Sequence, residues 1–424
     1  MKKNLYDFKN SLNGTKTKQI IALYLVNIIG IPLGIVTSMI LTNYLGPKLF
    51  GDYSYLNGIF TFAMVIFNFG FLYAANRALV LNDDREKAKE IYGSSFILLL
   101  LVFLLMSVCL IIFGYFDSNI NNKGLYEVFL YLMPFGWIYL LTNYFETLFQ
   151  ADNRIKALVF IRFYPKIGFF LSSLLIYFVF RKLDISKLLV VYVFYILTFL
   201  VVYAVALWEI KLSFKNLKPN FKSLWQYTKN YGFDVYIGSL FAVGVANLAT
   251  LIISNYDPLN SNEGVGFFNL ALTFTAPLAL IPNIVATTHY KEFAGLDKIP
   301  SKLFKTTILL TLGSLVVLWV FIGPFIDMFY GKQYHSAIEL TLIISLGIAA
   351  HGMADFFNRY LGAHGKGKML RNSSVVVGIS LLITNFLFIP IWHEKGAVFA
   401  RLISGMVYLL NMLFYYKKYT NSKK

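Results

Sequence analysis

Charge and cysteine are both scarce in this sequence of 424 residues. Only 14% of the residues are charged, whereas 58% are hydrophobic, and the mean hydropathy is +0.63. A soluble protein of this length needs considerably more polar surface. Cys109 is the only cysteine in the sequence, and a single cysteine cannot form an internal disulfide or a cysteine-based metal site. Its position inside an apolar run is typical of a small buried hydrophobic residue.

Patterns for catalysis and nucleotide binding are also missing. The nearest thing to a phosphate loop, Gly362–Lys368, lacks both the Walker spacing and a Ser or Thr after its lysine. The histidines are scattered, with no spacing that suits a metal: His289, His335, His351, His364 and His393. No expected loop exceeds about twenty residues, which leaves no room for a catalytic domain. The sequence therefore predicts that the chain is not an enzyme and holds no metal or cofactor.

Long apolar runs recur from one end of the sequence to the other. The run Ile91–Tyr115, for example, contains no charged residue. A helix needs about 20 apolar residues to cross a bilayer core, and these runs have that length. The expected fold is therefore an all-α integral membrane protein of about twelve spans. We place the spans at residues 19–43, 53–79, 91–115, 125–150, 157–180, 188–210, 231–254, 265–289, 304–329, 336–361, 373–391 and 397–416.

The distribution of lysine and arginine predicts the orientation of these spans. With the N-terminus placed inside, the inner segments hold 25 of these residues and the outer segments hold 7. This bias predicts that both termini are cytoplasmic and that the number of spans is even. Most of the net charge of +17 is thus topological, with some attraction to anionic lipid headgroups and no nucleic-acid partner. The basic first eighteen residues precede a helix that we interpret as retained, rather than as a signal peptide.

The longest expected inner connection, Lys211–Asn230, divides the chain into six spans plus six. We therefore expect one lobe at 1–215 and a second at 216–424. A weak internal repeat supports this division, because Asn43-Tyr44 precedes Gly51-Asp-Tyr53 and Asn255-Tyr256 precedes Gly266-Phe-Phe268. Two halves with the same orientation are typical of a parallel repeat about an axis along the membrane normal.

Cations inside the expected spans are candidates for substrate binding, since charge at membrane depth is costly and usually faces a cavity or a partner. Arg162 and Lys166 lie four residues apart on one helical face, with Pro165 between them. We expect this pair either to line an anion-attracting cavity or to hold helices together through an ion pair with Glu146. Arg77 and Arg401 are further candidates for the cavity, although each could instead reach a membrane interface.

Acids and amides inside the spans suggest further roles. Glu146 and Asp355 are candidates for binding a coupling proton or cation, and Asp355 could also pair with Arg359 four residues later. Asn27, Asn68 and Asn269 could bond sugar hydroxyls, although such amides often join neighbouring helices. Prolines and glycines within the spans predict bent or discontinuous helices. These are Gly30-Ile-Pro32-Leu-Gly34, Pro134, Pro277, Pro282 and Gly323-Pro324.

Short motifs along almost the whole chain resemble the polysaccharide transporters of the multidrug/oligosaccharidyl-lipid/polysaccharide (MOP) exporter superfamily, and specifically the O-antigen (Wzx-type) flippases. Each motif is short, and their order and spacing carry the likeness. They are Leu45-Gly-Pro-Lys-Leu-Phe-Gly-Asp-Tyr53, Asn68-Phe-Gly-Phe71 followed by Arg77, Phe149-Gln150-Ala151, Tyr330-Gly331, Gly362-Ala-His-Gly-Lys366, and Ile389-Pro390 followed by Gly396-Ala397.

The resemblance implies two six-helix lobes that form a V around a central cavity, as in MATE-like exporters. It implies a flippase that moves polyprenyl-diphosphate-linked oligosaccharide from the inner to the outer leaflet of a bacterial plasma membrane, coupled to a proton or sodium gradient. Such flippases serve O-antigen and hence lipopolysaccharide, capsule or exopolysaccharide assembly, with a polysaccharide polymerase and a chain-length regulator as partners. A cationic lumen that faces the diphosphate would give Arg77, Arg162 and Lys166 their role.

Two departures from the family pattern leave alternatives open. Asp234 stands only near the inner end of span seven, with Asn247 further out, and the stretch after Gly396-Ala397 contains Arg401. The alternatives in the same superfamily are a drug or cation antiporter and a flippase for the peptidoglycan precursor. A membrane glycosyltransferase, a polymerase and a purely structural subunit are readings from other classes, and the first two normally show a large outer loop.

Overall fold

The computed structural model describes residues 15–422 except 83, 134–135, 183–185 and 258–260. The residues within these ranges are almost all helical, and none of them forms a strand. Eight of the described helices are long and apolar enough to cross a membrane. The bent pair α6 (Tyr126–Leu132) and α7 (Gly136–Ala151) makes a ninth when it counts as one span. The expected all-α, multi-pass architecture is confirmed.

Each expected span falls mainly on helical segments, although the second contains a turn at 67–70 and residues 134–135 of the fourth lie outside the description. One long helix holds two expected spans, and another holds the first expected span and the beginning of the second, because the backbone leaves helical geometry inside both helices. α2 (Thr15–Ile66) is interrupted at Gly46, where φ is 73°. α17 (Gly367–Asn421) is interrupted at His393, where φ is 52°. The breaks at Gly46 and His393 therefore fall between consecutive expected spans, so one continuous helix in the structure can contain parts of two spans.

The chain forms two units of mutually contacting residues that alternate along the sequence. Unit 1 comprises residues 1–44, 66–117 and 126–236, and unit 2 comprises residues 45–65, 118–125 and 237–424. Helix α2 therefore contributes its first part to unit 1 and its second part to unit 2. The expected lobe boundary between residues 215 and 216 stays a prediction.

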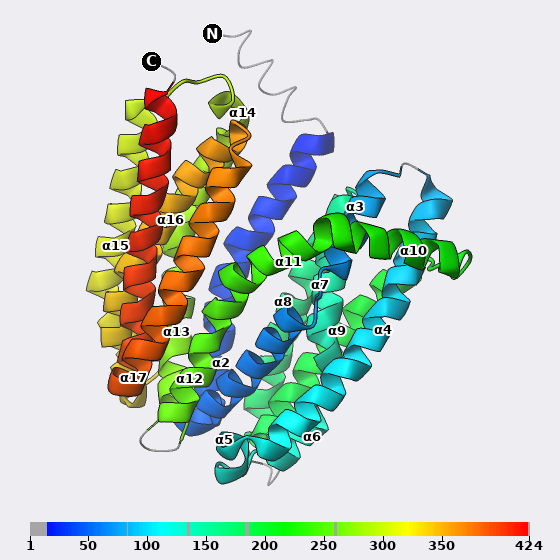
Figure 1. Cartoon of the computed structure of the whole chain (residues 1–424). Helices are drawn as coiled ribbons and strands as arrows, with labels where there is room; N and C mark the ends of the chain where they lie inside the picture. Colours follow the sequence, from blue (N-terminus) through cyan, green and yellow to red (C-terminus); the bar gives the residue numbers. More distant parts are fainter. Residues whose placement is uncertain (1–14, 83, 134–135, 183–185, 258–260, 423–424) are drawn as a thin grey trace. The chain divides into compact units, whose positions relative to one another are not determined.

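Unit 1 is built on helices that pack side by side around α7 and α8. Helix α8 packs against α7 and α9, and α3 packs against α4, α7 and α10 (Figure 1). Tyr144 of α7 donates a hydrogen bond to the carbonyl of Tyr92 on α4 at 2.9 Å, and both side chains are fully buried. The bounds are α3 (Phe71–Val80), α4 (Arg85–Phe116), α8 (Ile155–Val179), η2 (Phe180–Lys182), α9 (Lys187–Ile210) and α10 (Leu217–Tyr227).

In unit 2, helix α16 packs against both α13 and α17, and α15 covers α13 and α16 (Figure 1). Tyr360 of α16 is fully buried and donates to the carbonyl oxygens of Leu296 and Asp297, which fastens the connection before α15. The bounds are α5 (Ser118–Asn122), α12 (Val245–Tyr256), α13 (Glu263–Thr288), α14 (Tyr290–Phe293), α15 (Ser301–Phe329), η5 (Lys332–Tyr334) and α16 (Ser336–Ala363).

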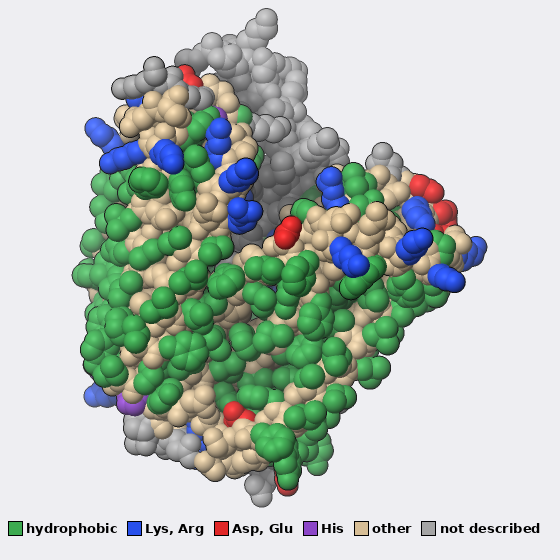
Figure 2. Space-filling view, in the orientation of Figure 1, with side chains coloured by type: hydrophobic (Ala, Val, Ile, Leu, Met, Phe, Trp, Pro, Cys, Tyr) green, Lys and Arg blue, Asp and Glu red, His purple; other side chains and the backbone are tan. Residues whose placement is uncertain are grey.

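Large apolar side chains are exposed along the middle of the long helices. Leu104 on α4 and Val320 on α15 are among them. On the face of unit 2 seen in Figure 2, apolar side chains cover the helices, and lysine and arginine gather mainly at the end where α17 ends. A bilayer core has no water to solvate polar groups, so a helix that crosses it exposes apolar side chains to the lipid, as these helices do. The chain is a multi-pass membrane protein.

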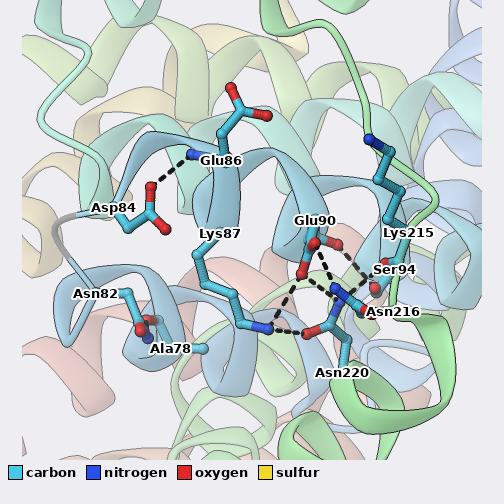
Figure 3. A network of polar contacts seen from close by, with 10 residues as sticks. All are labelled: Ala78, Asn82, Asp84, Glu86, Lys87, Glu90, Ser94, Lys215, Asn216 and Asn220. Carbon is cyan, nitrogen blue, oxygen red and sulfur yellow. Dashed lines mark hydrogen bonds and ion pairs between the residues drawn. The ribbon is translucent and has the colours of Figure 1, made fainter.

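The expected inner loop Lys211–Asn230 is not simply a loop, because α10 occupies much of it. Asn220, Leu224 and Thr228 are buried at intervals of four residues, so one side of this segment packs and the other is exposed. Figure 3 shows how the packed side is held to α4. Asn220 accepts from Lys87 Nζ at 2.7 Å and donates to Glu90, and Asn216 also donates to Glu90, at 2.8 Å. Polar partners on another helix thus stabilise a short segment that its own sequence marks only weakly.

Pro134 lies outside the described residues, between α6 and α7, and the other prolines that the sequence singled out do not interrupt their helices. Residues 30–34 stay helical within α2, and α13 and α15 contain their prolines. Apart from Gly46 and His393, the interruptions are a turn at 67–70 and two π-helical segments, η3 (Thr228–Gly232) and η4 (Leu240–Gly244), which flank α11 (Phe233–Ser239). Spanning helices tolerate proline where neighbouring groups satisfy the freed carbonyl. Positive φ at Phe69 and Gly70 turns the chain instead.

Candidate substrate site

An ion pair joins two adjacent helices of unit 1. Arg162 on α8 donates from Nε to Glu146 Oε1 on α7 at 3.0 Å. The two side chains are 30% and 39% exposed, so the pair is neither fully buried nor fully solvated. Of the two readings that the sequence left open for Arg162, the structure shows the ion pair with Glu146. An arginine retains further donors after one such bond, so Arg162 can still contact an anion.

Lys166 lies one turn further along α8 and packs against a glycine of α2. A methyl group in place of the hydrogen of Gly30 would lie 2.8 Å from Lys166 Nζ and 3.3 Å from Cδ. The absence of a side chain at Gly30 therefore makes room for the lysine. Among the described residues, no acidic group lies within ion-pair distance of Lys166, although Glu146 and Arg162 are close enough to act on its charge.

Glu146, Arg162 and Lys166 form a group that we call the α7–α8 cluster. Its formal charge is +1, because one acid stands against two bases. A surplus cation on a membrane-spanning helix is costly unless it meets an anion, a cavity or water. A diphosphate is a suitable anion, since ammonium and guanidinium groups are the usual phosphate ligands. The cluster can thus hold a phosphate-bearing substrate.

An apolar groove lies between α2 and α8, further along α8 than Lys166. Its volume is about 300 Å³, and it is lined by residues between Val36 and Asn43 of α2 and between Phe170 and Phe178 of α8. The lining side chains are mostly aliphatic and aromatic. The groove and the cluster share helix α8, and Gly30 of α2 lies against Lys166 of the cluster, so a ligand with a charged head and an apolar tail suits this part of unit 1.

Arg77 and Arg401 are in different settings. Arg77 is exposed on α3 and forms no ion pair with any residue that the structure describes. Arg401 on α17 donates from Nη2 to the carbonyl of Ala246 on α12 at 2.9 Å. Its Nε is buried and has no hydrogen-bond partner within the described part of the chain. Arg401 therefore joins α17 to α12 and retains an unused donor among the described residues.

Asp355 does not pair with Arg359, so that expectation is wrong. It accepts a hydrogen bond from Tyr408 at 3.0 Å, and Tyr408 in turn accepts from Asn358 at 2.9 Å. Residues four apart on a helix can pair, but Tyr408 on α17 offers a donor directly across the helix contact, and Arg359 is exposed. The ring of His351 contacts the ring of the same tyrosine in a tilted arrangement, with ring centroids 4.6 Å apart. Asp355 thus belongs to a polar group inside unit 2.

The three candidate asparagines differ in their surroundings. Asn68 is buried, and its Oδ1 has no hydrogen-bond partner among the described residues. Asn269 donates to the carbonyl of Val265 on its own helix at 3.0 Å. The side chain of Asn27 lies outside the described residues. Contacts of these amides with sugar hydroxyls stay a prediction.

A second polar network, which the sequence did not single out, lies inside unit 2. Asn262 is fully buried, donates to Asp52 at 2.8 Å and accepts from Ser254 at 2.6 Å. Lys123 donates to Ser254 and to Asn262, the latter at 2.7 Å. Gly51 packs so closely on the carbonyl of Asn262 that a side chain there would overlap it. The position of Asp52 within the repeated Gly51-Asp-Tyr53 motif, and of Ser254 directly before Asn255-Tyr256, was the available signal.

Sequence comparisons connect the chain to a family of glycan-related proteins. A family model described as "Polysaccharide biosynthesis protein" matches residues 17–290. The capsular polysaccharide biosynthesis protein CapF of Staphylococcus aureus is 23% identical over 221 residues. That match covers 50% of this chain and 54% of CapF, so it spans about half the length of the curated relative.

Solved structures of membrane transporters share the fold. The chain superposes on the lipid II flippase MurJ in an inward closed conformation with a TM-score of 0.72 and 17% identity, covering 94% of this chain and 87% of that one. An inward-facing multidrug resistance MATE family transporter of the MOP superfamily gives a TM-score of 0.71 and 12% identity, covering 96% and 100%. At these identities the likeness shows the fold alone, and the expected MOP fold is confirmed.

Proposed function

Because the chain belongs to the polysaccharide biosynthesis protein family, we propose that it is a flippase that moves polyprenyl-diphosphate-linked oligosaccharide from the cytoplasmic to the outer leaflet. The family membership and the fold of a membrane transporter support this class of function. The nature of the substrate is an inference from the α7–α8 cluster and the groove beside it.

The observation that carries the proposal is the environment of Lys166. Its ammonium group lies on a spanning helix against Gly30, and no acid among the described residues pairs with it directly. An ammonium group in that position is stabilised by an anionic partner. A diphosphate supplies that partner, and Arg162 can add donors from one turn away. A drug antiporter for organic cations would instead need an acidic, unpaired site.

The apolar groove extends the same argument to the lipid part of the substrate. A polyprenyl chain is flexible and apolar, and burial of its methylenes contributes about 0.8 kcal/mol for each group. The groove between α2 and α8 offers about 300 Å³ of mostly apolar space near the cluster. Head and tail of one amphipathic molecule can therefore bind to adjacent stretches of α8, with α7 beside the head and α2 beside the tail.

Transport up a concentration gradient requires a source of energy, and a proton or sodium gradient is our proposal. Glu146 in the α7–α8 cluster and Asp355 beside Tyr408 are the proposed coupling groups. We place the protein in a bacterial plasma membrane with both termini in the cytoplasm. Glycan assembly of the O-antigen, capsule or exopolysaccharide type would bring a polymerase and a chain-length regulator as partners.

Reconstitution in proteoliposomes tests the proposal directly. The assay measures transfer of a fluorescent polyprenyl-diphosphate oligosaccharide across the bilayer under a proton or sodium gradient. Lys166→Gln should abolish transfer, and Lys166→Arg should retain most of it, because the charge is kept. Lys305→Gln is the matched control, since Lys305 is an exposed cation at the start of α15. If the wild type, Lys166→Gln and the Arg162→Ala, Lys166→Ala double variant transfer the substrate equally well, the proposed anion-binding site is wrong.

A flippase for the peptidoglycan precursor is the second candidate, because the lipid II flippase MurJ shares the fold over 94% of this chain. The same vesicles distinguish the two candidates when they are loaded in parallel with the labelled peptidoglycan precursor. They also test a fluorescent organic cation, as the MATE likeness requires. Transfer of the cation alone would contradict both flippase readings.

A further inference from the structure

A charged cavity of about 740 Å³ opens at one end of unit 1. Three segments far apart in the sequence form it: the first turns of α4, the turn between α7 and α8, and the last residues of α9. None of the residues of the α7–α8 cluster lines it, and the expected topology places all three segments on the cytoplasmic side of the membrane.

Cations outnumber acids in the lining of this cavity. Five basic side chains face three acidic ones, which leaves a net formal charge of +2. The acids are Glu86, Asp152 and Glu209. The bases are Arg85, Lys89, Arg154, Lys156 and Lys211.

Two of the acids are already occupied by cations of the same cavity. Arg154 donates from Nε to Asp152 Oδ2 at 2.6 Å, and Tyr92 donates to the same carboxylate oxygen at 3.2 Å. The Arg154 guanidinium also lies 5.7 Å from the centroid of the Tyr92 ring. Lys89 pairs with Glu86 at 2.5 Å. These bonds hold the wall of the cavity in place.

The remaining charges are unbalanced. Arg85, Lys156 and Lys211 are exposed and form no ion pair within the described part of the chain, and only Glu209 opposes them. The first turn of α8, at Ile155–Ala157, also lines the cavity, and no side chain caps that end of the helix. Its free backbone amides add donors that favour an anion.

The position of the cavity indicates where the anion comes from. Trp208, at the end of α9 and next to the lining residues Glu209 and Lys211, is 82% exposed. Exposed tryptophan at the end of a spanning helix is typical of the headgroup level of a bilayer. Basic pockets between spanning helices on the cytoplasmic side suit lipid phosphates.

We propose that this cavity binds a phosphate group, carried by an anionic lipid headgroup or by a soluble phosphate. Arg85, Lys156 and Lys211 contact the phosphate oxygens, and the Asp152–Arg154 pair shapes the wall. The site is separate from the transport site, so the inference does not depend on the proposed function. A bound lipid would tie α4, α8 and α9 together at the inner membrane surface.

Binding measurements on the purified, delipidated full-length protein test this proposal. Native mass spectrometry compares phosphatidylglycerol with phosphatidylcholine, and thermal unfolding in detergent is recorded with and without inorganic phosphate. The test variant is Arg85→Gln, Lys156→Gln, Lys211→Gln. The control, Lys218→Gln, Lys222→Gln, Lys298→Gln, removes the same charge from exposed positions on the expected cytoplasmic side. A second variant, Arg85→Lys, Lys156→Arg, Lys211→Arg, keeps the charge and checks the fold.

The wild type, the control and the charge-keeping variant should prefer phosphatidylglycerol, and the test variant should bind it roughly tenfold to a hundredfold more weakly. Stabilisation by inorganic phosphate, lost in the same variant and without preference for phosphatidylglycerol, would assign the site to a soluble phosphate. If the wild type and the test variant bind phosphatidylglycerol equally well and are stabilised equally by inorganic phosphate, the proposal is overturned. An equal loss in test and control variants also overturns it, because it would reflect net charge alone.

Discussion

Gly51 and Gly266 lie backbone against backbone within unit 2. A methyl group on Gly266 would lie 3.2 Å from both Cα and N of Gly51. The two glycines hold corresponding places in the internal repeat, since each follows an Asn-Tyr pair by a few residues. The contact joins the two repeated motifs, and the parallel arrangement of the repeats stays a prediction.

Gly51→Ala should destabilise the protein, because the added methyl group would overlap the carbonyl of Asn262. Backbone atoms cannot move aside as a flexible side chain can, so we expect a cost of about 1–3 kcal/mol. Thermal unfolding in detergent, followed by size-exclusion chromatography, measures this cost. Gly34→Ala on the same helix α2 is the control, since no atom lies within 4 Å of a methyl group there. An unchanged midpoint for Gly51→Ala would mean that this contact is looser than described.

Lys123→Met should also destabilise unit 2, for an electrostatic reason. Lys123 donates to Ser254 and to Asn262, and both acceptors are buried. Without the ammonium group these acceptors lose a donor, which costs about 1–3 kcal/mol. Lys395→Met removes a cation from an ion pair with Glu339 that is about half exposed, and we expect less than about 1 kcal/mol there. Similar shifts of the unfolding midpoint for both variants would contradict the special role of Lys123.

The membrane fold follows from the sequence because a bilayer imposes a simple rule on composition and length. Apolar runs and the balance of lysine and arginine locate the helical spans without knowledge of their contacts. Tertiary contacts are not accessible in this way. Lys123 and Asn262 are 139 residues apart, and nothing in their local patterns connects them. Helix α10 could not be predicted for the same reason, since the side chains that hold it to α4 bond to Glu90, 126 and 130 residues earlier in the sequence.

The candidate site shows the same division. The spacing of Arg162 and Lys166 predicts a shared helical face, and Glu146 is correctly named as a partner of Arg162. The space that Gly30 leaves for Lys166 could not be predicted, because it depends on how α2 passes α8. For Asp355, local spacing suggested Arg359, but Tyr408 from another helix provides the bond. Residue spacing identifies possible partners, and packing selects among them.

Glu90→Ala should loosen α10 from α4. Glu90 accepts hydrogen bonds from Lys87, Asn216 and Asn220, and Asn220 is buried. Loss of this acceptor removes hydrogen bonds that join α10 to α4, so we expect roughly tenfold faster amide exchange in residues 217–227. Hydrogen–deuterium exchange with mass spectrometry measures this rate. Glu86→Ala is the control, because that side chain is 73% exposed and pairs only with Lys89 among the described residues. Equal exchange in the two variants would show that α10 is held by apolar contacts instead.

Glu146→Gln separates a coupling role from a structural one, because it removes the charge and nearly preserves the shape. The ion pair with Arg162 is partly exposed, so its loss should lower stability by less than about 1 kcal/mol. If Glu146 binds the coupling ion, transfer of the labelled substrate should lose its dependence on the proton or sodium gradient while the protein stays folded.

The matched control for Glu146 is Glu339→Gln, which breaks the exposed pair with Lys395 and should leave the gradient response intact. Asp355→Asn tests the other proposed coupling group in the same vesicles. A double-mutant cycle of Glu146→Gln with Arg162→Gln adds the energetic part, since a purely structural pair gives an interaction energy in unfolding but none in gradient response. A wild-type gradient response in Glu146→Gln would assign Glu146 to positioning Arg162, and Asp355 would then be the remaining candidate for coupling.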